Sequence, residues 1–256
     1  MQPINEYSSV ERGEHGIARL TIGNAGALNI LNSTVISAVR DALNTLAQDD
    51  TIRALILAGS GEKAFIGGAD IKEMATLDQA SAEVFITGLR DLCEAVRLFP
   101  VPVIARLRGW CLGGGLEVAA ACDLRIAAED AKFAMPEVKV GIPSVIHAAL
   151  LPRLIGWGRA RWLILTAATI DAPTALDWGF VEQVVPVAQL DKAIQAAATA
   201  IAECGQQAIR SQKTLLREWE ELPLTESVNV SVKTFGRSYT TDEPRTLMRG
   251  FLNRRK

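Results

Sequence analysis

Residues 102–123, PVIARLRGWCLGGGLEVAAACD, decide the fold. An apolar, β-branched segment is followed by three consecutive glycines at 113–115 and by an alanine-rich run with one carboxylate, Glu117. Consecutive glycines give up side-chain packing and raise the entropic cost of folding, so we expect them where another group must approach the backbone closely. A carboxylate in an apolar run is costly to bury unless it is paired or used in chemistry. The stretch therefore predicts a strand, a glycine turn and a buried helix, with an active site at the turn.

Length and composition predict one large domain, or a domain with a small appendage, without a membrane or nucleic-acid partner. The chain has 256 residues, 49% of them hydrophobic, and a net charge of −2. It contains no apolar run of eighteen residues and no signal-peptide pattern, so we expect a cytoplasmic protein. Two histidines and four cysteines without paired spacing predict reduced thiols and no metal site; the cysteines are Cys93, Cys111, Cys122 and Cys204.

Strand and helix patterns alternate through the first two thirds of the chain, and helix patterns dominate the rest. Short apolar or alternating segments predict strands at 17–22, 54–58, 103–107, 124–128 and 181–185. Amphipathic patterns predict helices from about residue 32, over 80–98, and at 148–154, 159–166, 172–178, 189–204, 208–220, 225–239 and 244–253. Loops are expected over 59–74 and 133–144. This order predicts an α/β core over residues 1–195 and a helical region over 196–256.

Two glycine turns and two acids carry the candidate chemistry. The stretch 66–70 (IGGAD) and the turn 113–115 each offer main-chain N–H groups beside a helix start. Two such donors aimed at one point stabilise negative charge that develops on a carbonyl oxygen. Glu117 and Glu137 supply a pair of carboxyl groups, and two acids in one apolar pocket divide acid and base roles because both cannot ionise freely. Without a Ser–His nucleophile, this set favours enolate chemistry over acyl hydrolysis.

Three motifs together closely resemble the crotonase, or enoyl-CoA hydratase/isomerase, superfamily. They are KAFIGGADIKEM (63–74), GWCLGGGLEVAAACDLRIA (109–127) and FAMPEVKVGIP (133–143), and the resemblance extends over nearly the whole chain. It implies a crotonase-type spiral of β-β-α turns. It also implies that the helical region 196–256 serves oligomerisation, as a homotrimer or homohexamer, and acts as a lid.

The resemblance also implies the reaction and the residues that perform it. Ala69 and Gly114 match two oxyanion donors that grip the thioester oxygen of an acyl-CoA. Glu117 matches the acid that positions a water molecule, and Glu137 the acid/base that delivers the proton. That water adds across the 2,3 double bond of a 2-enoyl-CoA, without a cofactor because coenzyme A is part of the substrate. An enoyl-CoA isomerase or an acyl-CoA hydrolase is the alternative within the superfamily.

Further residues are expected at the substrate through the same resemblance. Those that contact the substrate or its CoA part are Ala27, Leu28, Gly67, Asp70, Ile71 and Lys72, and the basic end, Arg249, Arg254, Arg255 and Lys256, could hold CoA phosphates. The chain departs from the superfamily pattern after Glu137, where Ser144 and His147 replace glycines. We expect these two residues and Trp110 to shape the acyl pocket.

The same residues can also be weighed for structural roles and for other classes of protein. Asp70 is also a good helix N-cap, Cys111 a small core residue, and His147 a residue at a helix start. A dinucleotide-binding turn is excluded because Val118 stands where G-x-G-x-x-G needs its third glycine. Ser60 lacks the first glycine of G-x-S-x-G, which argues against a serine hydrolase. A binding protein that kept the fold would need a basic surface stripe, which the near-neutral charge does not favour.

Overall fold

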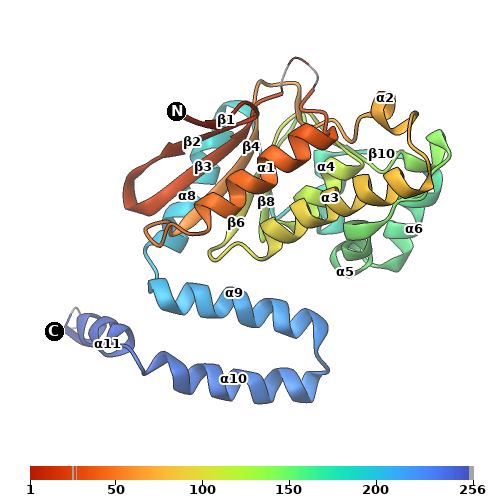
Figure 1. Ribbon diagram of the computed structural model, residues 1–256. Helices are drawn as coiled ribbons and strands as arrows, with labels where there is room; N and C mark the ends of the chain where they lie inside the picture. Colours follow the sequence, from red (N-terminus) through yellow and green to blue (C-terminus); the bar gives the residue numbers. More distant parts are fainter. Residues whose placement is uncertain (25, 27, 254–256) are drawn as a thin grey trace.

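Two β-sheets form the centre of the molecule in the computed structural model, which describes residues 1–24, 26 and 28–253 (Figure 1). The larger sheet has the strand order β1-β2-β3-β4-β6-β8-β11, and the smaller has the order β10-β9-β7-β5. The strands are β1 Gln2–Asn5, β2 Ser8–Arg12, β3 Ile17–Ile22, β4 Ala54–Gly59, β5 Ala64–Ile66, β6 Val103–Leu107, β7 Trp110–Leu112, β8 Leu124–Ala128, β9 Lys132–Ala134, β10 Thr169–Asp171 and β11 Gln183–Val185.

A strand of the large sheet is followed three times by a strand of the small sheet and then by helical structure. The pairs are β4 with β5, β6 with β7, and β8 with β9. Successive members run parallel within each sheet, β4 beside β6 beside β8 and β5 beside β7 beside β9. The chain therefore winds as a spiral of β-β-α turns, as the sequence predicts.

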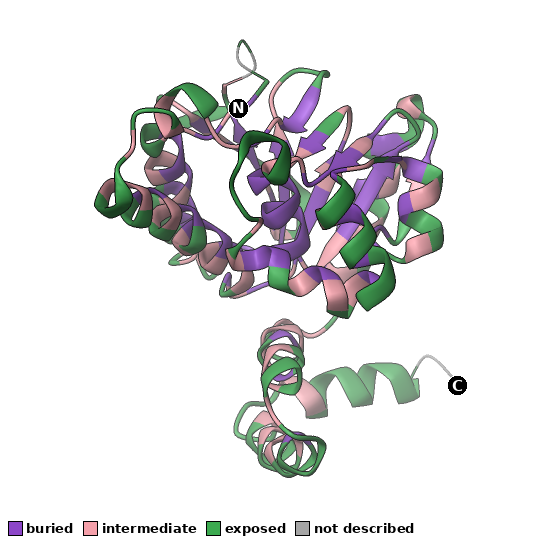
Figure 2. Cartoon of the chain, turned by 90° about the vertical axis from the view of Figure 1, so that its right-hand side faces the viewer, coloured by how far each residue is buried: buried purple, intermediate pink, exposed green. Residues whose placement is uncertain are grey.

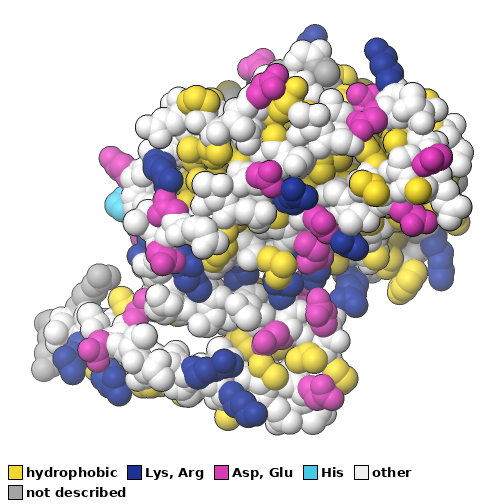
Figure 3. Space-filling model, viewed as in Figure 1, with side chains coloured by type: hydrophobic (Ala, Val, Ile, Leu, Met, Phe, Trp, Pro, Cys, Tyr) yellow, Lys and Arg dark blue, Asp and Glu magenta, His cyan; other side chains and the backbone are white. Residues whose placement is uncertain are grey.

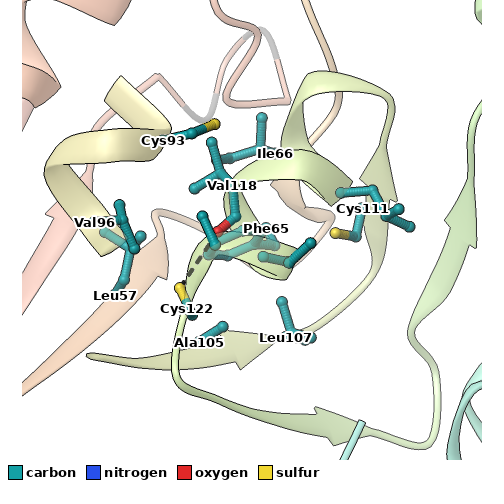
Figure 4. Close-up of a cluster of buried hydrophobic side chains, with 14 of the residues drawn as sticks. Leu57, Phe65, Ile66, Cys93, Val96, Ala105, Leu107, Cys111, Val118 and Cys122 are labelled. Carbon is teal, nitrogen blue, oxygen red and sulfur yellow. Dashed lines mark hydrogen bonds between the residues drawn. The ribbon is translucent and has the colours of Figure 1, made fainter. Parts of the chain in front are cut away.

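Helices cover both faces of the large sheet and enclose an apolar core. Those of the core are α1 Ser33–Leu46, α2 Ile71–Met74, α3 Gln79–Arg97, α4 Gly114–Ala121, α5 Leu151–Ile155, α6 Trp157–Thr166, α7 Ala172–Trp178 and α8 Leu190–Ala202, with 3₁₀ turns η1 Glu14–Gly16, η3 Glu137–Val140, η4 Ile146–Leu150 and η5 Val187–Gln189. Helix α4 is buried along its whole length, because it runs through the core between the sheet and α3 (Figure 2). Cys93, Cys111 and Cys122 are unpaired thiols among the apolar side chains around it (Figure 4).

The C-terminal helices leave the core and extend away from it (Figure 1). They are α9 Gln206–Glu221, α10 Leu224–Ser238 and α11 Glu243–Asn253. Helix α8 stays on the sheet, where its apolar face is buried as far as Ala202. The extended region therefore begins at Gln206, and the division expected at residues 195/196 falls inside α8.

A buried ion pair attaches the extended region to the core. The Nζ of Lys213, on α9, lies 2.7 Å from Oδ2 of Asp123 and donates to the carbonyl of Val101 at 3.0 Å. Lys213 is buried, and burial lowers the pKa of its ammonium group while Asp123 opposes that shift. This contact holds the middle of α9 against the core.

The described residues contain no helix that is both long and apolar enough to span a bilayer. In the same part of the chain, no three His, Cys, Asp or Glu side chains gather where they could hold a metal ion.

Candidate active site

A cleft of about 800 Å³ opens between α3, the loop before α2 and the segment that follows β9. Most side chains that line it are apolar, and it also contains acidic side chains, those of Asp78, Glu83, Glu117 and Glu137. Its lining comprises Gly67, Gly68, Ala69, Ile71, Met74, Leu77, Asp78, Gln79, Ala82, Glu83, Phe85, Ile86, Leu89, Leu112, Gly113, Gly114, Glu117, Pro136, Glu137, Lys139, Val140, Ile142, Pro143 and Val145. The cleft thus joins both glycine turns and both candidate acids, which come from three separate stretches of the sequence: 66–70, 113–117 and the segment that begins at Glu137.

Ala69 and Gly114 each bring a free main-chain N–H group to this cleft. The N–H of Leu31 donates to the carbonyl of Gly68, and the N–H of Asp70 donates to the carbonyl of Leu31. The N–H of Ala69, between these two bonds, has no acceptor among the described residues. Gly114 is the first residue of α4, where the helix itself supplies no acceptor. Both groups are available to a carbonyl oxygen bound in the cleft.

The glycine turn is required by close packing. A Cβ at residue 113 would overlap Oε1 of Glu137, and one at residue 115 would overlap the carbonyl of Ile66. Gly113 also has φ of +51°, a conformation that residues with side chains rarely adopt. The turn therefore brings the start of α4 and the carboxyl group of Glu137 into contact.

Glu117 is a buried acid with one main-chain partner. It lies in the first turn of α4, and its Oε1 accepts a hydrogen bond from the N–H of Ala148 at 3.1 Å. Burial raises the pKa of Glu117 to about 8; the hydrogen bond opposes this shift, and the charge of Glu137 adds to it. At neutral pH the carboxyl group is therefore largely protonated.

Glu137 is more exposed and is held by a side chain. It begins the 3₁₀ turn η3 directly after Pro136, and its Oε2 accepts a hydrogen bond from Oγ of Ser144 at 2.8 Å. The effect of Glu137 on the pKa of Glu117 is an electrostatic repulsion between the two carboxyl groups. Two different elements, α4 and η3, therefore present the two acids to one cleft.

His147 does not line the cleft. Its ring is buried, and Nε2 lies 2.8 Å from Oε1 of Glu94 on α3. Burial lowers the pKa of His147, so the ring is neutral at pH 7 and donates Nε2–H to the Glu94 carboxylate. Its contact anchors the segment that follows η3 to α3. Its side chain turns toward Glu94, so His147 could act on the acyl pocket only through the segment that it holds.

Ser144 and Trp110 also lie outside the lining of the cleft. Ser144 turns its hydroxyl onto Glu137. Trp110 stands 42% exposed at the start of β7, whereas Leu112 at the end of that strand, next to the glycine turn, reaches the cleft. Neither residue is therefore part of the wall of this cleft.

The remaining predicted residues lie at the loop that precedes α2 or near it. Gly67 and Ile71 line the cleft, and the side chain of Asp70 caps α2 by accepting from the N–H of Lys72. Lys72 is exposed beside Ile71 on α2, and the carbonyl of Leu28 accepts from the N–H of Gly67. Ala27 and the basic residues 254–256 lie outside the described residues.

Two parts of the site were not predicted. The apolar wall comes from α3 and from residues after η3, where Phe85, Leu89 and Val140 are examples. The amphipathic pattern of residues 80–98 predicts that one face of this helix is buried. It does not show that part of the same face lines a cleft. Asn29 is fully buried with φ of +55°, and its side-chain amide donates to the carbonyls of Ser60, Ala64 and Phe65. It ties the loop before α1 to β5, which leads into Gly67–Ala69.

Comparison with known proteins agrees with this geometry. The family model described as enoyl-CoA hydratase/isomerase matches residues 12–256. A crotonyl-CoA hydratase of Syntrophomonas wolfei is 35% identical over 244 residues, which cover 95% of this chain and 94% of that protein. A short-chain-enoyl-CoA hydratase of Clostridium acetobutylicum is 33% identical with the same coverage. The crystal structure of an enoyl-CoA hydratase from Bacillus anthracis matches with a TM-score of 0.93, 31% identity and 97% coverage of both chains. By sequence and by fold, this chain belongs to the enoyl-CoA hydratase/isomerase family.

Proposed function

We propose that this protein is an enoyl-CoA hydratase, which adds water across the 2,3 double bond of a 2-enoyl-CoA to give a 3-hydroxyacyl-CoA. The observation that carries the proposal is the pair Glu117 and Glu137 in one apolar cleft that also receives the N–H groups of Ala69 and Gly114. Two acids can hold and activate a single water molecule, and the N–H pair can bind the thioester oxygen. The names of the relatives described above support the same activity.

The carboxyl groups take different parts in the proposed reaction. Neutral Glu117 holds the water, and the Glu137 carboxylate removes one of its protons as the water oxygen bonds to C3. The electron pair of the double bond moves toward the thioester, whose oxygen becomes an enolate oxygen bound by the N–H groups of Ala69 and Gly114. Glu137 then gives the proton to C2. One water is consumed, both carboxyl groups return to their starting state, and no cofactor takes part.

The cleft also offers places for the two ends of the substrate. The apolar side chains of α3 and of the segment after η3 would enclose the acyl chain. Leu28, which precedes α1, and Ile71 and Lys72 on α2 would contact the CoA part. We assign coenzyme A to the α2 side of the cleft because Asp78 and Glu83 line the α3 side, where their charges would repel the phosphates of coenzyme A.

Loss of the enoyl thioester absorbance tests the activity. We expect purified protein to remove this absorbance from 2-enoyl-CoA substrates of graded chain length without releasing CoA thiol. Release of thiol at the rate of substrate loss would instead indicate the acyl-CoA hydrolase. Conversion of a 3-enoyl-CoA to a 2-enoyl-CoA, without hydration, would indicate the isomerase.

We further propose that the extended helices assemble the protein as a homotrimer or homohexamer and help to close the cleft of a neighbouring subunit. The support is their surface: α10 and α11 expose large apolar side chains, visible on the lower part of the molecule in Figure 3. Examples are Leu224, Val232 and Phe235, which are 80%, 68% and 67% exposed. Such an area of apolar surface is typical of an interaction site. The cytoplasmic location remains a prediction from the sequence.

A further inference from the structure

One short segment holds both acids of the candidate site. Ser144 donates its hydroxyl to Oε2 of Glu137 at 2.8 Å, and four residues later the N–H of Ala148 donates to Oε1 of Glu117 at 3.1 Å. Between them, His147 binds Glu94 of α3. Residues 144–148 therefore link η3, which carries Glu137, to α4, which carries Glu117, and attach both to α3.

The hydroxyl of Ser144 acts on one acid without entering the cleft. Glu137 lines the cleft and Ser144 does not, so a substrate there would contact the carboxyl group and not the serine. The other oxygen of Glu137, Oε1, lies against the backbone of Gly113. Its carboxyl group is thus fixed from two sides, by the glycine turn at Oε1 and by the serine at Oε2.

Charged groups near Glu137 come from three elements. Glu117 lies across the cleft on α4, Lys139 follows on η3, and Asp78 and Glu83 line the wall formed by α3 and its N-cap. The Nζ of Lys139 is occupied, because it donates to the carbonyl of Ala167 at 3.0 Å. The described residues hold no cation in an ion pair with Glu137, so the hydroxyl of Ser144 is its side-chain hydrogen-bond donor.

We propose that Ser144 is a positioning residue, whose hydroxyl orients the carboxyl group of Glu137 toward the reacting water. The proposal rests on the proposed hydratase function. The hydrogen bond at Oε2 decides which carboxyl oxygen faces the serine and which lies at the glycine turn. It also restricts the rotation of a side chain that must meet C2 and water in succession.

Kinetics of Ser144→Ala and Ser144→Thr test this role. For Ser144→Ala we expect kcat to fall about 10- to 100-fold, the range for losing a hydrogen bond to a charged group, with KM little changed. The melting temperature of Ser144→Ala should stay close to that of the wild type, so that the loss of kcat is not a loss of folding. Ser144→Thr keeps the hydroxyl and should restore kcat. Wild-type kcat in folded Ser144→Ala would overturn the proposal.

A double variant separates positioning from a general structural effect. In the Glu137→Gln background, Ser144→Ala should cause little further loss of kcat, because the serine acts through the carboxylate that is already gone. A full additional loss in the double variant would show that Ser144 acts elsewhere and would contradict the proposal.

A spectrum without substrate keeps this inference separate from the hydratase activity. In protein with ¹³C-labelled glutamate side-chain carboxyl carbons, the NMR signal of Glu137 is the one that disappears in Glu137→Gln. At fixed pH its chemical shift should move in Ser144→Ala and return toward the wild-type value in Ser144→Thr, because the hydrogen bond at Oε2 is lost and then restored. An unmoved signal would overturn the role of Ser144. A shifted signal in a protein that hydrates no enoyl-CoA would instead overturn the proposed function and leave the Ser144–Glu137 interaction established.

Discussion

The main-chain N–H of Ala148 donates to Oε1 of Glu117 across 3.1 Å, although 31 residues separate the two in the sequence. This bond opposes the effect of burial on the pKa of Glu117 but does not cancel it, since that pKa still rises to about 8. Glu117 therefore carries a proton at neutral pH, whereas Glu137 in the same cleft is held by a hydroxyl donor. Both residues are glutamates, so the raised pKa of Glu117 comes from its burial and not from the kind of side chain.

Titration of Glu117 should make folding stability depend on pH. An ordinary glutamate titrates near 4.5, and Glu117 titrates near 8 in the folded chain. Between these values the folded state binds more protons than the unfolded state, so stability falls as pH rises, by up to about 1.4 kcal/mol per pH unit. Above pH 8 this loss is complete.

Glu117→Gln removes that titration and isolates its contribution. The free energy of unfolding of both proteins should be measured with urea from pH 5 to pH 9. Relative to the wild type, that of the variant should increase by a few kcal/mol in total over this range. Other groups titrate in both proteins and cancel in the difference. A stability difference that does not change with pH would mean that Glu117 is ionised in the folded protein.

Loss of either acid should stop the proposed reaction. We expect Glu117→Gln and Glu137→Gln each to lower kcat for hydration by about 10²- to 10⁴-fold, the usual contribution of a general acid or base. Circular dichroism should show that both variants remain folded, because Gln has nearly the same shape as Glu. Turnover close to wild type in both variants would reject the two-acid mechanism.

Gly113→Ala should damage activity and stability together. A Cβ there would displace Oε1 of Glu137, and the positive φ adds about 1–3 kcal/mol of strain. Gly179→Ala is the matched control, since Gly179 has φ of +81° at the end of α7, where a Cβ meets only an ordinary contact. The control should lower the melting temperature and leave kcat unchanged. Equal kcat values for the two variants would contradict the contact between Gly113 and Glu137.

Removing the N–H of Gly114 tests the proposed oxyanion site. Proline is tolerated at the first position of a helix and carries no N–H, so Gly114→Pro should keep α4 and lower kcat about 10²- to 10³-fold. Gly114→Ala retains the N–H and places a Cβ near the flexible end of Leu89, 2.8 Å away before adjustment. The alanine variant should therefore be the more active of the two. If both lose activity equally in folded protein, the N–H group has no special role.

Charges on α10 should disrupt the proposed assembly. Light scattering after gel filtration should give a trimer or hexamer for the wild type and smaller species for Val232→Asp combined with Phe235→Asp, because both side chains are exposed on the single chain. A monomeric wild type at micromolar concentration would reject the assembly.

The long strands and helices could be predicted from the sequence because each has several periods of its pattern. Strand β3 matches the prediction at 17–22, and α1 begins after Asn32, whose side chain caps it by accepting from the N–H of Val35. The short strands β5, β7, β9 and β10 have three residues each and were not predicted, since three residues hold too little of a repeat. Strands β1 and β2 were missed because their residues are polar and partly exposed.

The candidate site was predicted where it depends on local sequence and missed where it depends on tertiary contacts. Glycine turns and acids are visible in the chain, and the structure brings Ala69, Gly114, Glu117 and Glu137 to one cleft. The direction of a side chain is not visible, so Ser144 and His147 were expected to face the acyl group, whereas they bind Glu137 and Glu94. Their partners come from η3 and α3, which no pattern in residues 144–148 identifies.

Hydration in water enriched in ¹⁸O is the measurement that tests the proposed reaction most directly. Mass spectrometry of the products should show a 3-hydroxyacyl-CoA with one ¹⁸O on C3 and an intact thioester, formed by the wild type and at least about 10²-fold more slowly by Glu137→Gln. A free acid with ¹⁸O in its carboxyl group, or an unlabelled isomer of the substrate, would contradict the assignment of Glu117 and Glu137 to the addition of water.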